Sequence, residues 1–451
     1  MKRFILLAIC LLSSATMSVA QVTELSIDAS ANSIIRSVDG DYVLIYTEKA
    51  TGDAYFMLYR DGDPTAKAFQ VMYGVHVRDV RIYDGKTAYF CGRDVLYDWG
   101  VVGMFDIASV FAGTDDVYYG GCNWSSGTWR LKPTDLKRLD LFDSAGVVGM
   151  AMVGESLTDL GFYEGGTTVA SAWFDGSWNM CAHLNKGNFV HFTDVACLEN
   201  SIVAVGNDGT DRGCRIKTFK PALHFPEFYH VYTPGFAQSI NYLSPVGDVL
   251  ATRGGKDTVL IVHYDNDIKV KTVLHRAKIS PATGIPVAPV DTWYTDIPSV
   301  VSYSSGWNLL ELADSGHSAY LLQYAKFPTA TGLVHRLSRI PTLAAPSSAD
   351  LWKPLYGRQH SMDLDAVTLE PRLSGIDNNL VLHAPIWLPQ DGACYEYAPM
   401  PVKQASASVD TMFIPEDAMH PNVYTHIDTP TLFDVSADVI CQDSKGKEEK
   451  K

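Results

Sequence analysis

The chain has 451 residues, of which 47% are hydrophobic and 19% charged, a balance that supports a large folded core and excludes an intrinsically disordered protein. Its formal net charge is −15. Because nucleic acids and anionic membrane surfaces are polyanions, this charge argues against both as partners.

The first 20 residues have the organisation of a secretory signal peptide. Two basic residues precede an apolar stretch over residues 4–12, and Ser-Val-Ala ending at Ala20 is a small-x-small cleavage site. The apolar stretch is too short to span a bilayer, and no later run is long enough for a membrane helix. Lipidation of Cys10 is the alternative, but Ile9 stands where a small residue is expected. We therefore expect cleavage after Ala20 and a secreted or periplasmic bacterial protein with no integral membrane segment.

The rest of the chain has the pattern of strands. Runs rich in Val, Ile, Tyr, Phe and Thr are bounded by Gly, Asn and Asp, and six Asp-Gly dipeptides suit two-residue hairpin turns. Short turns followed at once by an apolar strand recur seven times, at residues 39–40, 84–85, 165–166, 199–200, 246–247, 305–306 and 377–378.

The spacing of these turns predicts the architecture. They are roughly 34 to 81 residues apart, about 56 on average, which suits a four-stranded propeller blade. We predict an all-β chain in which residues 21–441 form a single β-propeller of seven four-stranded blades, with six or eight blades as alternatives. A strand near residues 22–29 is expected to complete the last blade, and residues 442–451 form a charged, disordered tail.

Two segments resemble the β-propeller repeats of the LVIVD type. These are VRDVRIYDGKTAYFCG (77–92), followed by GVVGMFDI (100–107), and FTDVACLENSIVAVG (192–206). The repeats of that family run VxDVxVxGxxAYVA and then, after a short gap, GLxVxDI. The resemblance covers about half of the chain in fragments. It implies a fold but no reaction, because propellers host many unrelated functions.

An aspartate recurs near the start of the repeats, at Asp79, Asp159, Asp194 and Asp296. One interpretation places these carboxylates around the channel mouth, where they bind a cation or sugar hydroxyls. The other is that each accepts backbone N–H bonds in the turn into the inner strand. Because a residue that recurs with the repeat more often serves the repeat, we favour the structural role.

Aromatic residues in the long intervals are the candidate ligand contacts. The interval from 85 to 159 predicts an insertion centred on residues 112–140, and the Pro-rich stretch 281–298 predicts an ordered loop. Insertions and loops of repeat proteins often carry binding. The candidates in these two segments are Trp124, Trp129, Trp293 and Tyr294. Trp173 and Trp178 flank a turn and are expected to pack against each other across the hairpin.

Seven cysteines remain after cleavage, so at least one is unpaired or intermolecular. Pairing of Cys394 with Cys441 would tie the C-terminal segment to the last repeat. The His224–His230 spacing does not fit a zinc motif, and we expect neither a metal nor a cofactor. No local motif for a nucleophile, a nucleotide or a dinucleotide is present.

These observations favour an exported, non-catalytic binding or interaction module, whose partner is a protein or a glycan. One alternative is a carbohydrate-active enzyme, a glycoside hydrolase or lyase, with its site at the channel mouth. It would require a cleft with two or three perturbed carboxylates near exposed Trp. The other alternative is a structural subunit of an envelope assembly, which predicts a large exposed apolar patch with the unpaired cysteine at it.

Overall fold

The computed structural model describes residues 21–442, apart from short segments. These segments are 39, 125–130, 159–165, 186–189, 209–212, 222–235, 242–244, 266–270, 297–307, 343–345, 366, 384–390, 414–415 and 420. The expected signal peptide and residues 443–451 of the expected tail lie outside the described residues.

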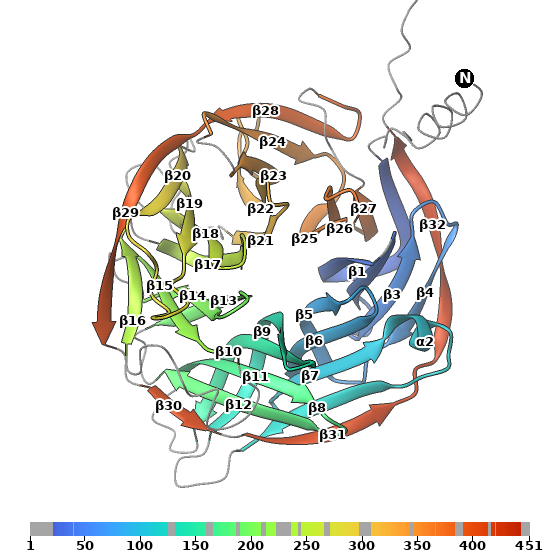
Figure 1. Cartoon of the computed structure of the whole chain (residues 1–451). Coiled ribbons are helices and arrows are strands. Elements are labelled where there is room, and N and C mark those ends of the chain that lie inside the picture. The colour runs from blue at the N-terminus through green and yellow to red at the C-terminus, as the bar shows by residue number, and fades with distance from the viewer. Residues whose placement is uncertain are drawn as a thin grey trace, which may run out of the picture.

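The described chain is all-β, as predicted, with antiparallel strands in successive groups around a central axis (Figure 1). Each group begins with an innermost strand and proceeds outward. The groups are β1 (Gln21–Val38), β2 (Asp41–Glu48), β3 (Ala54–Arg60) and β4 (Thr65–Gln70); β5 (Val75–Tyr83), β6 (Thr87–Asp94), β7 (Trp99–Asp106) and β8 (Val117–Asn123); β9 (Leu131–Ser144), β10 (Val147–Thr158), β11 (Gly166–Phe174) and β12 (Trp178–Asn185); β13 (His191–Cys197), β14 (Ile202–Asn207), β15 (Cys214–Phe219) and β16 (Phe236–Asn241); β17 (Pro245–Arg253), β18 (Thr258–Asp265), β19 (Lys271–Lys278) and β20 (Val290–Asp296); β21 (Asn308–Asp314), β22 (Ser318–Lys326), β23 (Leu333–Pro341) and β24 (Ser348–Pro354); and β25 (Arg358–Leu364), β26 (Pro371–Asp377) and β27 (Asn379–His383).

The first strand closes the ring. The first part of β1 pairs with β27, with Val22 opposite His383, whereas its second part pairs with β2, with Ile35 opposite Leu44. The N-terminal strand therefore belongs to the last group and the first group at once. This confirms the expectation that a strand near residues 22–29 completes the last group.

The hydrophobic core lies between neighbouring groups. Between the β1 and β5 groups, Phe56, Phe69, Phe90 and Phe105 are fully buried, and the ring of Phe56 lies 4.9–5.5 Å from the other three. Glycine makes room for this packing, since a Cβ on Gly103 would lie 2.0 Å from the ring of Phe90. A short helix, α2 (Ile107–Phe111), follows β7 and packs its apolar side on the same cluster.

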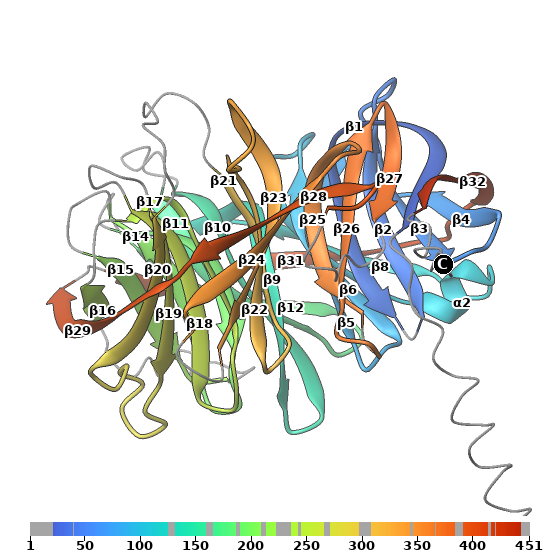
Figure 2. The same ribbon diagram turned by 90° about the horizontal axis from the view of Figure 1, so that it is seen from above.

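The C-terminal segment forms a belt, defined here as residues 395–442, which runs around the outside of the ring (Figures 1 and 2). Its strands add an outer partner to β24, β20, β16, β12, β8, β4 and β1 in turn, running backward through the groups. The belt strands are β28 (Tyr395–Pro401), β29 (Lys403–Phe413), β30 (Glu416–Met419), β31 (Asn422–Asp428) and β32 (Leu432–Gln442).

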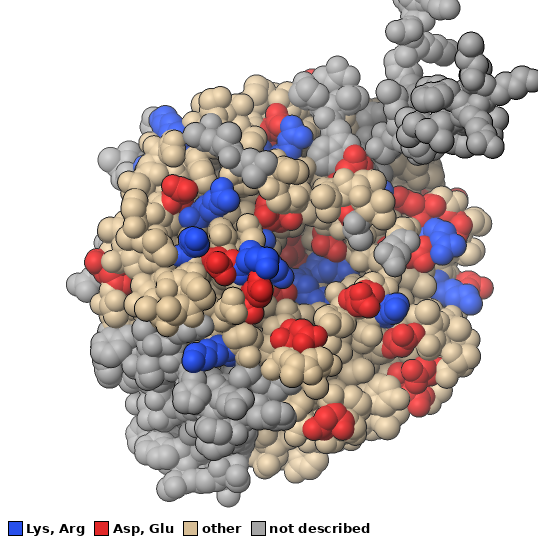
Figure 3. All heavy atoms as spheres, viewed as in Figure 1, with Lys and Arg blue, Asp and Glu red and all other residues tan. Residues whose placement is uncertain are grey.

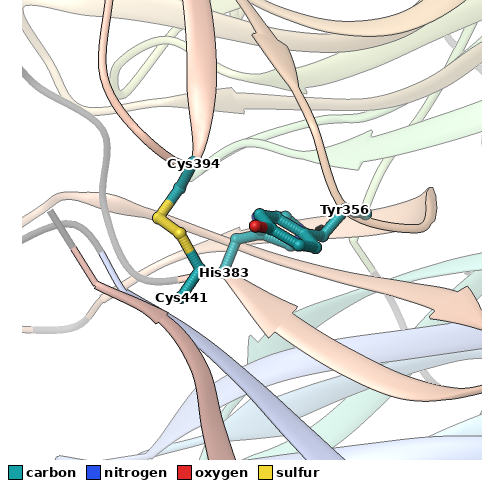
Figure 4. The surroundings of a disulfide bond; sticks show 4 residues. All are labelled: Tyr356, His383, Cys394 and Cys441. Carbon is teal, nitrogen blue, oxygen red and sulfur yellow. Dashed lines mark hydrogen bonds between the residues drawn. A yellow bond between two sulfur atoms is a disulfide. The ribbon is translucent and has the colours of Figure 1, made fainter.

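A disulfide joins the two ends of the belt. Cys394, just before β28, bonds to Cys441, near the end of β32, with Tyr356 and His383 beside it (Figure 4). The belt is thereby closed into a covalent loop around the groups. The structure thus contains the pairing that the sequence raised as a hypothesis, and the bond joins the start and the end of the belt.

Several positional expectations are wrong. The interval 112–140 holds two regular strands, β8 and β9, in place of an insertion. The predicted turns at 165–166 and 377–378 fall between a second strand and a third, and the predicted turn at 246–247 falls within β17, so these three positions do not mark the same point of the repeat as 84–85. Trp173 pairs with Asn179, while Trp178 pairs with Phe174. The two indoles are both buried, but they belong to different clusters.

The five described cysteines outside the disulfide are buried thiols: Cys91, Cys122, Cys181, Cys197 and Cys214. Burial raises the pKa of the Cys181 and Cys214 thiols to about 12, so these side chains stay protonated and unreactive at neutral pH. No described helix is long and apolar enough to cross a bilayer.

Two buried histidines predict a loss of stability in acid. The Nε2 atoms of His263 and His275 lie 3.0 Å apart, so one must donate and the other accept. Burial lowers the pKa of His263 to about 4 and that of His275 well below its ordinary value. Unfolded histidines protonate near pH 6.5, so the unfolded chain takes up protons first as the pH falls. Stability should fall between about pH 6.5 and pH 4, by about 3 kcal/mol from His263 alone.

The measurement is the urea midpoint at pH 7 and at pH 4.5 for the wild type and the double variant His263→Gln, His275→Gln. We expect a smaller decrease between the two pH values in the double variant, because its buried pair no longer titrates. His317→Gln, at an exposed position, is the control and should behave as the wild type. An equal decrease in the wild type and the double variant would contradict the assignment.

Candidate functional site

A cavity of about 740 Å³ lies at the centre of the ring, and every innermost strand contributes to its wall. Figure 3 shows basic and acidic side chains gathered around a hollow at this centre. The wall is formed by Ser33, Ile34, Val77, Arg78, Lys137, Arg138, Gly154, Glu155, His191, Phe192, Thr193, Asn207, Gly247, Asp248, Leu310, Glu311, His360 and Ser361.

β-Bulges on the innermost strands direct side chains into the cavity. The pairing of β5 with β6 skips Arg78, and the equivalent pairings in four other groups skip at least one residue each, with two skipped in the β9–β10 pairing. A bulge re-aims the extra side chain and often accompanies a functional site. One skipped residue from each of these five groups lines the cavity: Arg78, Lys137, Thr193, Leu310 and His360.

Four of the bulges sit against a glycine of the second strand. A Cβ on Gly206 would lie 1.9 Å from the carbonyl oxygen of His191. A Cβ on Gly92, Gly154 or Gly375 would likewise lie 2.0–2.6 Å from a carbonyl oxygen of the facing innermost strand. These glycines are paired with the residue that directly precedes the bulge. Their lack of a side chain therefore lets the bulged strand approach closely and holds the cavity wall in place.

Gly206→Ala should displace β13 and lower the free energy of unfolding by about 1–3 kcal/mol, the usual range for forcing atoms into a packed site. Gly332→Ala is the matched control, because a Cβ there meets no atom within 4 Å. Chemical denaturation of both variants provides the comparison. Equal stability of the two variants would show that the close contact at Gly206 is not needed.

Aspartates on four innermost strands connect the strand to the innermost strand of the next group. Asp79 Oδ1 accepts from its own neighbour Val80 N at 2.8 Å, and its Oδ2 accepts from Leu139 N of β9 at 3.0 Å. Asp194 makes the same two bonds, to Val195 N and to Ala251 N of β17. Both carboxylates therefore accept backbone N–H groups, one from their own strand and one from the innermost strand of the next group.

Sequence reasoning missed two further members of this set and included two residues outside it. Asp140 accepts from Leu141 N and from Cys197 N of β13, and Asp363 accepts from Ser37 N of β1. Asp296 is the last residue of β20, far along its group from the innermost strand. Asp159 lies outside the described residues. The start of each repeat was predicted from the turns. In the β9 group the predicted turn at 165–166 falls between β10 and β11, whereas the hairpin that begins with the innermost strand is β9–β10.

Beneath the cavity the aspartates meet buried arginines. Arg36, with 4% of its side chain exposed, donates to Asp79 at 2.7 Å and lies 3.5 Å from Glu311. Arg138 donates to Glu311 at 3.1 Å and also to the carbonyl oxygen of Leu310. Although burial opposes it, Arg81 and Arg36 lower the pKa of Asp79. The floor of the cavity is thus a fixed network of paired charges.

At the cavity wall itself the charges are also paired and more exposed. Arg78 makes a bidentate pair with Asp135, with both N–O distances 3.0 Å. Lys137 and Glu155 form an ion pair in which each side chain is about half exposed. Three basic and three acidic side chains line the cavity, so it carries no strong net charge: Arg78, Lys137, Arg138, Glu155, Asp248 and Glu311.

The candidate ligand aromatics do not line this cavity. Trp124 is partly buried just after β8, where its carbonyl oxygen accepts from Asn422 of the belt and Lys132 Nζ lies 5.6 Å from its ring. Trp293 is 4% exposed, and it lies with Tyr294 in β20 rather than in a loop. Trp129 lies outside the described residues. The three described candidates, Trp124, Trp293 and Tyr294, do not line the central cavity.

The sequence matches no protein-family model and no curated protein. Within the described part of the chain, no three His, Cys, Asp or Glu side chains are grouped as metal ligands.

Proposed function

We propose that the chain is a single seven-bladed β-propeller, related to the LVIVD-type repeat proteins, which acts after export as a non-catalytic binding module. Its ligand would occupy the central cavity. The observation that supports this proposal is the set of bulges, because five innermost strands each depart from regular pairing to aim a side chain into the same space. Packing of the hydrophobic core does not by itself require that regular strand pairing be interrupted at the same place in five groups.

The composition of the wall favours a small polar ligand of low net charge. Basic and acidic groups are balanced and mostly paired, and hydroxyl, amide and imidazole groups stand between them. Asn207 and Thr193 donate to carbonyl oxygens of the β17 strand, which fixes their orientation. A preorganised polar wall of this kind suits a hydroxyl-rich or zwitterionic molecule.

Binding is favoured over hydrolysis for a specific reason. A glycoside hydrolase needs two carboxyl groups placed on either side of the scissile bond. Of the three acidic residues at the wall, Glu155 and Glu311 are already paired with Lys137 and with arginines. The envelope-subunit alternative expected a thiol at an exposed apolar patch, whereas the five described cysteines outside the disulfide are buried.

A thermal-shift screen tests the proposal. Monosaccharides, disaccharides, amino acids and short peptides are added to the chain from Gln21 and to the double variant Lys137→Ala, Glu155→Ala. Because the pair is half exposed, its removal should change stability by no more than about 1 kcal/mol. We expect at least one compound to raise the Tm of the wild type and not that of this double variant.

The control is Lys256→Ala, Glu199→Ala, which removes an exposed ion pair of 3.1 Å outside the cavity wall. Its Tm should rise with the same compounds as the Tm of the wild type. If no compound raises the Tm of the wild type, or if the Tm of the Lys137→Ala, Glu155→Ala variant rises equally, the cavity is not the binding site.

A further inference from the structure

Three aromatic rings stack in a column at the rim of the molecule. The ring centroids of Tyr97 and Trp99 are 4.8 Å apart with an interplanar angle of 26°, and those of Trp99 and Tyr424 are 5.8 Å apart at 20°. Tyr97 lies in the turn between β6 and β7. Because Asp94 pairs with Val75, this turn is at the same ends of the strands as the cavity residue Arg78.

The outer rings of the column are open to solvent. Tyr97 is 61% exposed and Tyr424 56% exposed, and Leu96 beside them is 58% exposed. Trp99 covers one face of Tyr97, so the surface that remains exposed includes its other face. Large exposed apolar groups gathered at one place are typical of a binding surface.

Separate segments hold the column rigidly. Tyr424 is on the belt strand β31, directly opposite Gly121 of β8, and a Cβ on Gly121 would lie 2.8 Å from the indole of Trp99. Lys132 of β9 donates to the carbonyl oxygen of Tyr97 at 3.1 Å. The rings are thus fixed before any ligand arrives, which reduces the entropic cost of binding.

Polar groups stand at the margin of the column. Arg93 and Asp98 form an ion pair of 2.8 Å in which each side chain is 39% exposed, and Asn123 Nδ2 lies 3.5 Å from the hydroxyl of Tyr424. A pyranose ring presents a C–H face that stacks on an aromatic ring and hydroxyls around its edge that need donors and acceptors. We propose that this column binds carbohydrate, with a sugar ring stacked on the open face of Tyr97.

The small extent of the surface favours a sugar over a protein partner. A stable protein interface buries about 800 Å² on each side and involves about 20–30 residues. Here the apolar surface consists mainly of three rings with the Arg93–Asp98 ion pair directly beside them. A surface of this extent suits one or two sugar units. The site is independent of the central cavity and does not rest on the function proposed for it.

Native affinity electrophoresis tests the proposal, with gels containing mixed-linkage β-glucan, xylan, galactomannan or pectin. We expect at least one polysaccharide to retard the wild type, and Tyr97→Ala to weaken that binding at least about tenfold, as for an aromatic hot spot. Tyr97→Phe should retain most of it, because the ring remains. Tyr73→Ala removes an aromatic that is 69% exposed in a nearby loop, and it should bind as the wild type does.

Failure of all four polysaccharides to retard the wild type would overturn the proposal, as would equal losses in Tyr97→Ala and Tyr73→Ala. Retardation that is lost in the Lys137→Ala, Glu155→Ala variant but kept in Tyr97→Ala would place the sugar in the cavity. That result would overturn this inference and support the function proposed above, so the two are separated.

Discussion

Replacing Asp79 by alanine is expected to lower the free energy of unfolding by about 3–5 kcal/mol, the range for breaking a buried ion pair. Asp79 is 1% exposed, and its carboxylate accepts from Arg36, Arg81, Val80 N and Leu139 N. The substitution leaves the buried Arg36 guanidinium without its closest carboxylate. It also removes the acceptor that connects β5 to β9.

Urea denaturation measures this loss, with Asp41→Ala as the control. Asp41 pairs with Arg60 at 2.6 Å, but the arginine side chain is 65% exposed, so loss of this pair should change the stability little. Asp79→Asn keeps the shape of the side chain and should fall between the two. If Asp79→Ala costs no more than Asp41→Ala, the connection between innermost strands is not what holds the ring together.

Opening the disulfide should be the other large effect. The bond closes a segment with a sequence separation of 47 residues. The chain-entropy treatment of a loop of this length gives a stabilisation of about 4 kcal/mol, within the usual range of 2–5 kcal/mol for native disulfides. The belt strands depend on it especially, because β31 and β32 are largely exposed and bury few side chains of their own.

The comparison is between the wild type with and without a reductant and the double variant Cys394→Ser, Cys441→Ser. The reduced wild type and the variant should share a lower urea midpoint, and limited proteolysis should cut first within the belt. Because the five other described cysteines are buried thiols, reduction should act through this one bond. A midpoint that does not respond to reductant would show that the belt is held by its strand pairing alone.

Much of the local structure could be predicted from the sequence. Alternating apolar runs predict strands because a strand places successive side chains on opposite faces, and the described chain is made of such strands. The recurrence of Asp79 and Asp194 at the same point of two similar segments indicated that they occupy equivalent positions, and both make the same two backbone hydrogen bonds. The Cys394–Cys441 pair was raised from position alone, on the expectation of an exported chain, in which a disulfide is permitted.

The belt could not be predicted, because nothing local in its sequence indicates which strand it joins. In β31, Asn422–Asp428, most side chains are exposed, so no apolar alternation marks its pairing with β8. Nor does the sequence of β29 indicate that its first part pairs with β20 and its second part with β16. Such contacts between residues hundreds of positions apart arise only once the ring exists.

The cavity residues were missed although a signal for two of them was present. In both segments that resemble the repeat family, the residue before the aspartate is the bulge residue, Arg78 or Thr193. A glycine follows at the matching point of the second strand, at Gly92 and Gly206. Searching for this pairing of a bulge with a glycine would have located part of the wall. The candidate aromatics Trp124, Trp293 and Tyr294 were more visible in the sequence, but they do not line the cavity.

The most direct test of the proposed function is a crystal structure of the chain from Gln21, grown with whichever compound of the thermal-shift screen stabilises the wild type most. The account predicts density for that compound in the central cavity, in contact with at least two of the bulge residues Arg78, Lys137 and His360. A cavity that holds only water while the compound lies on another surface would contradict it.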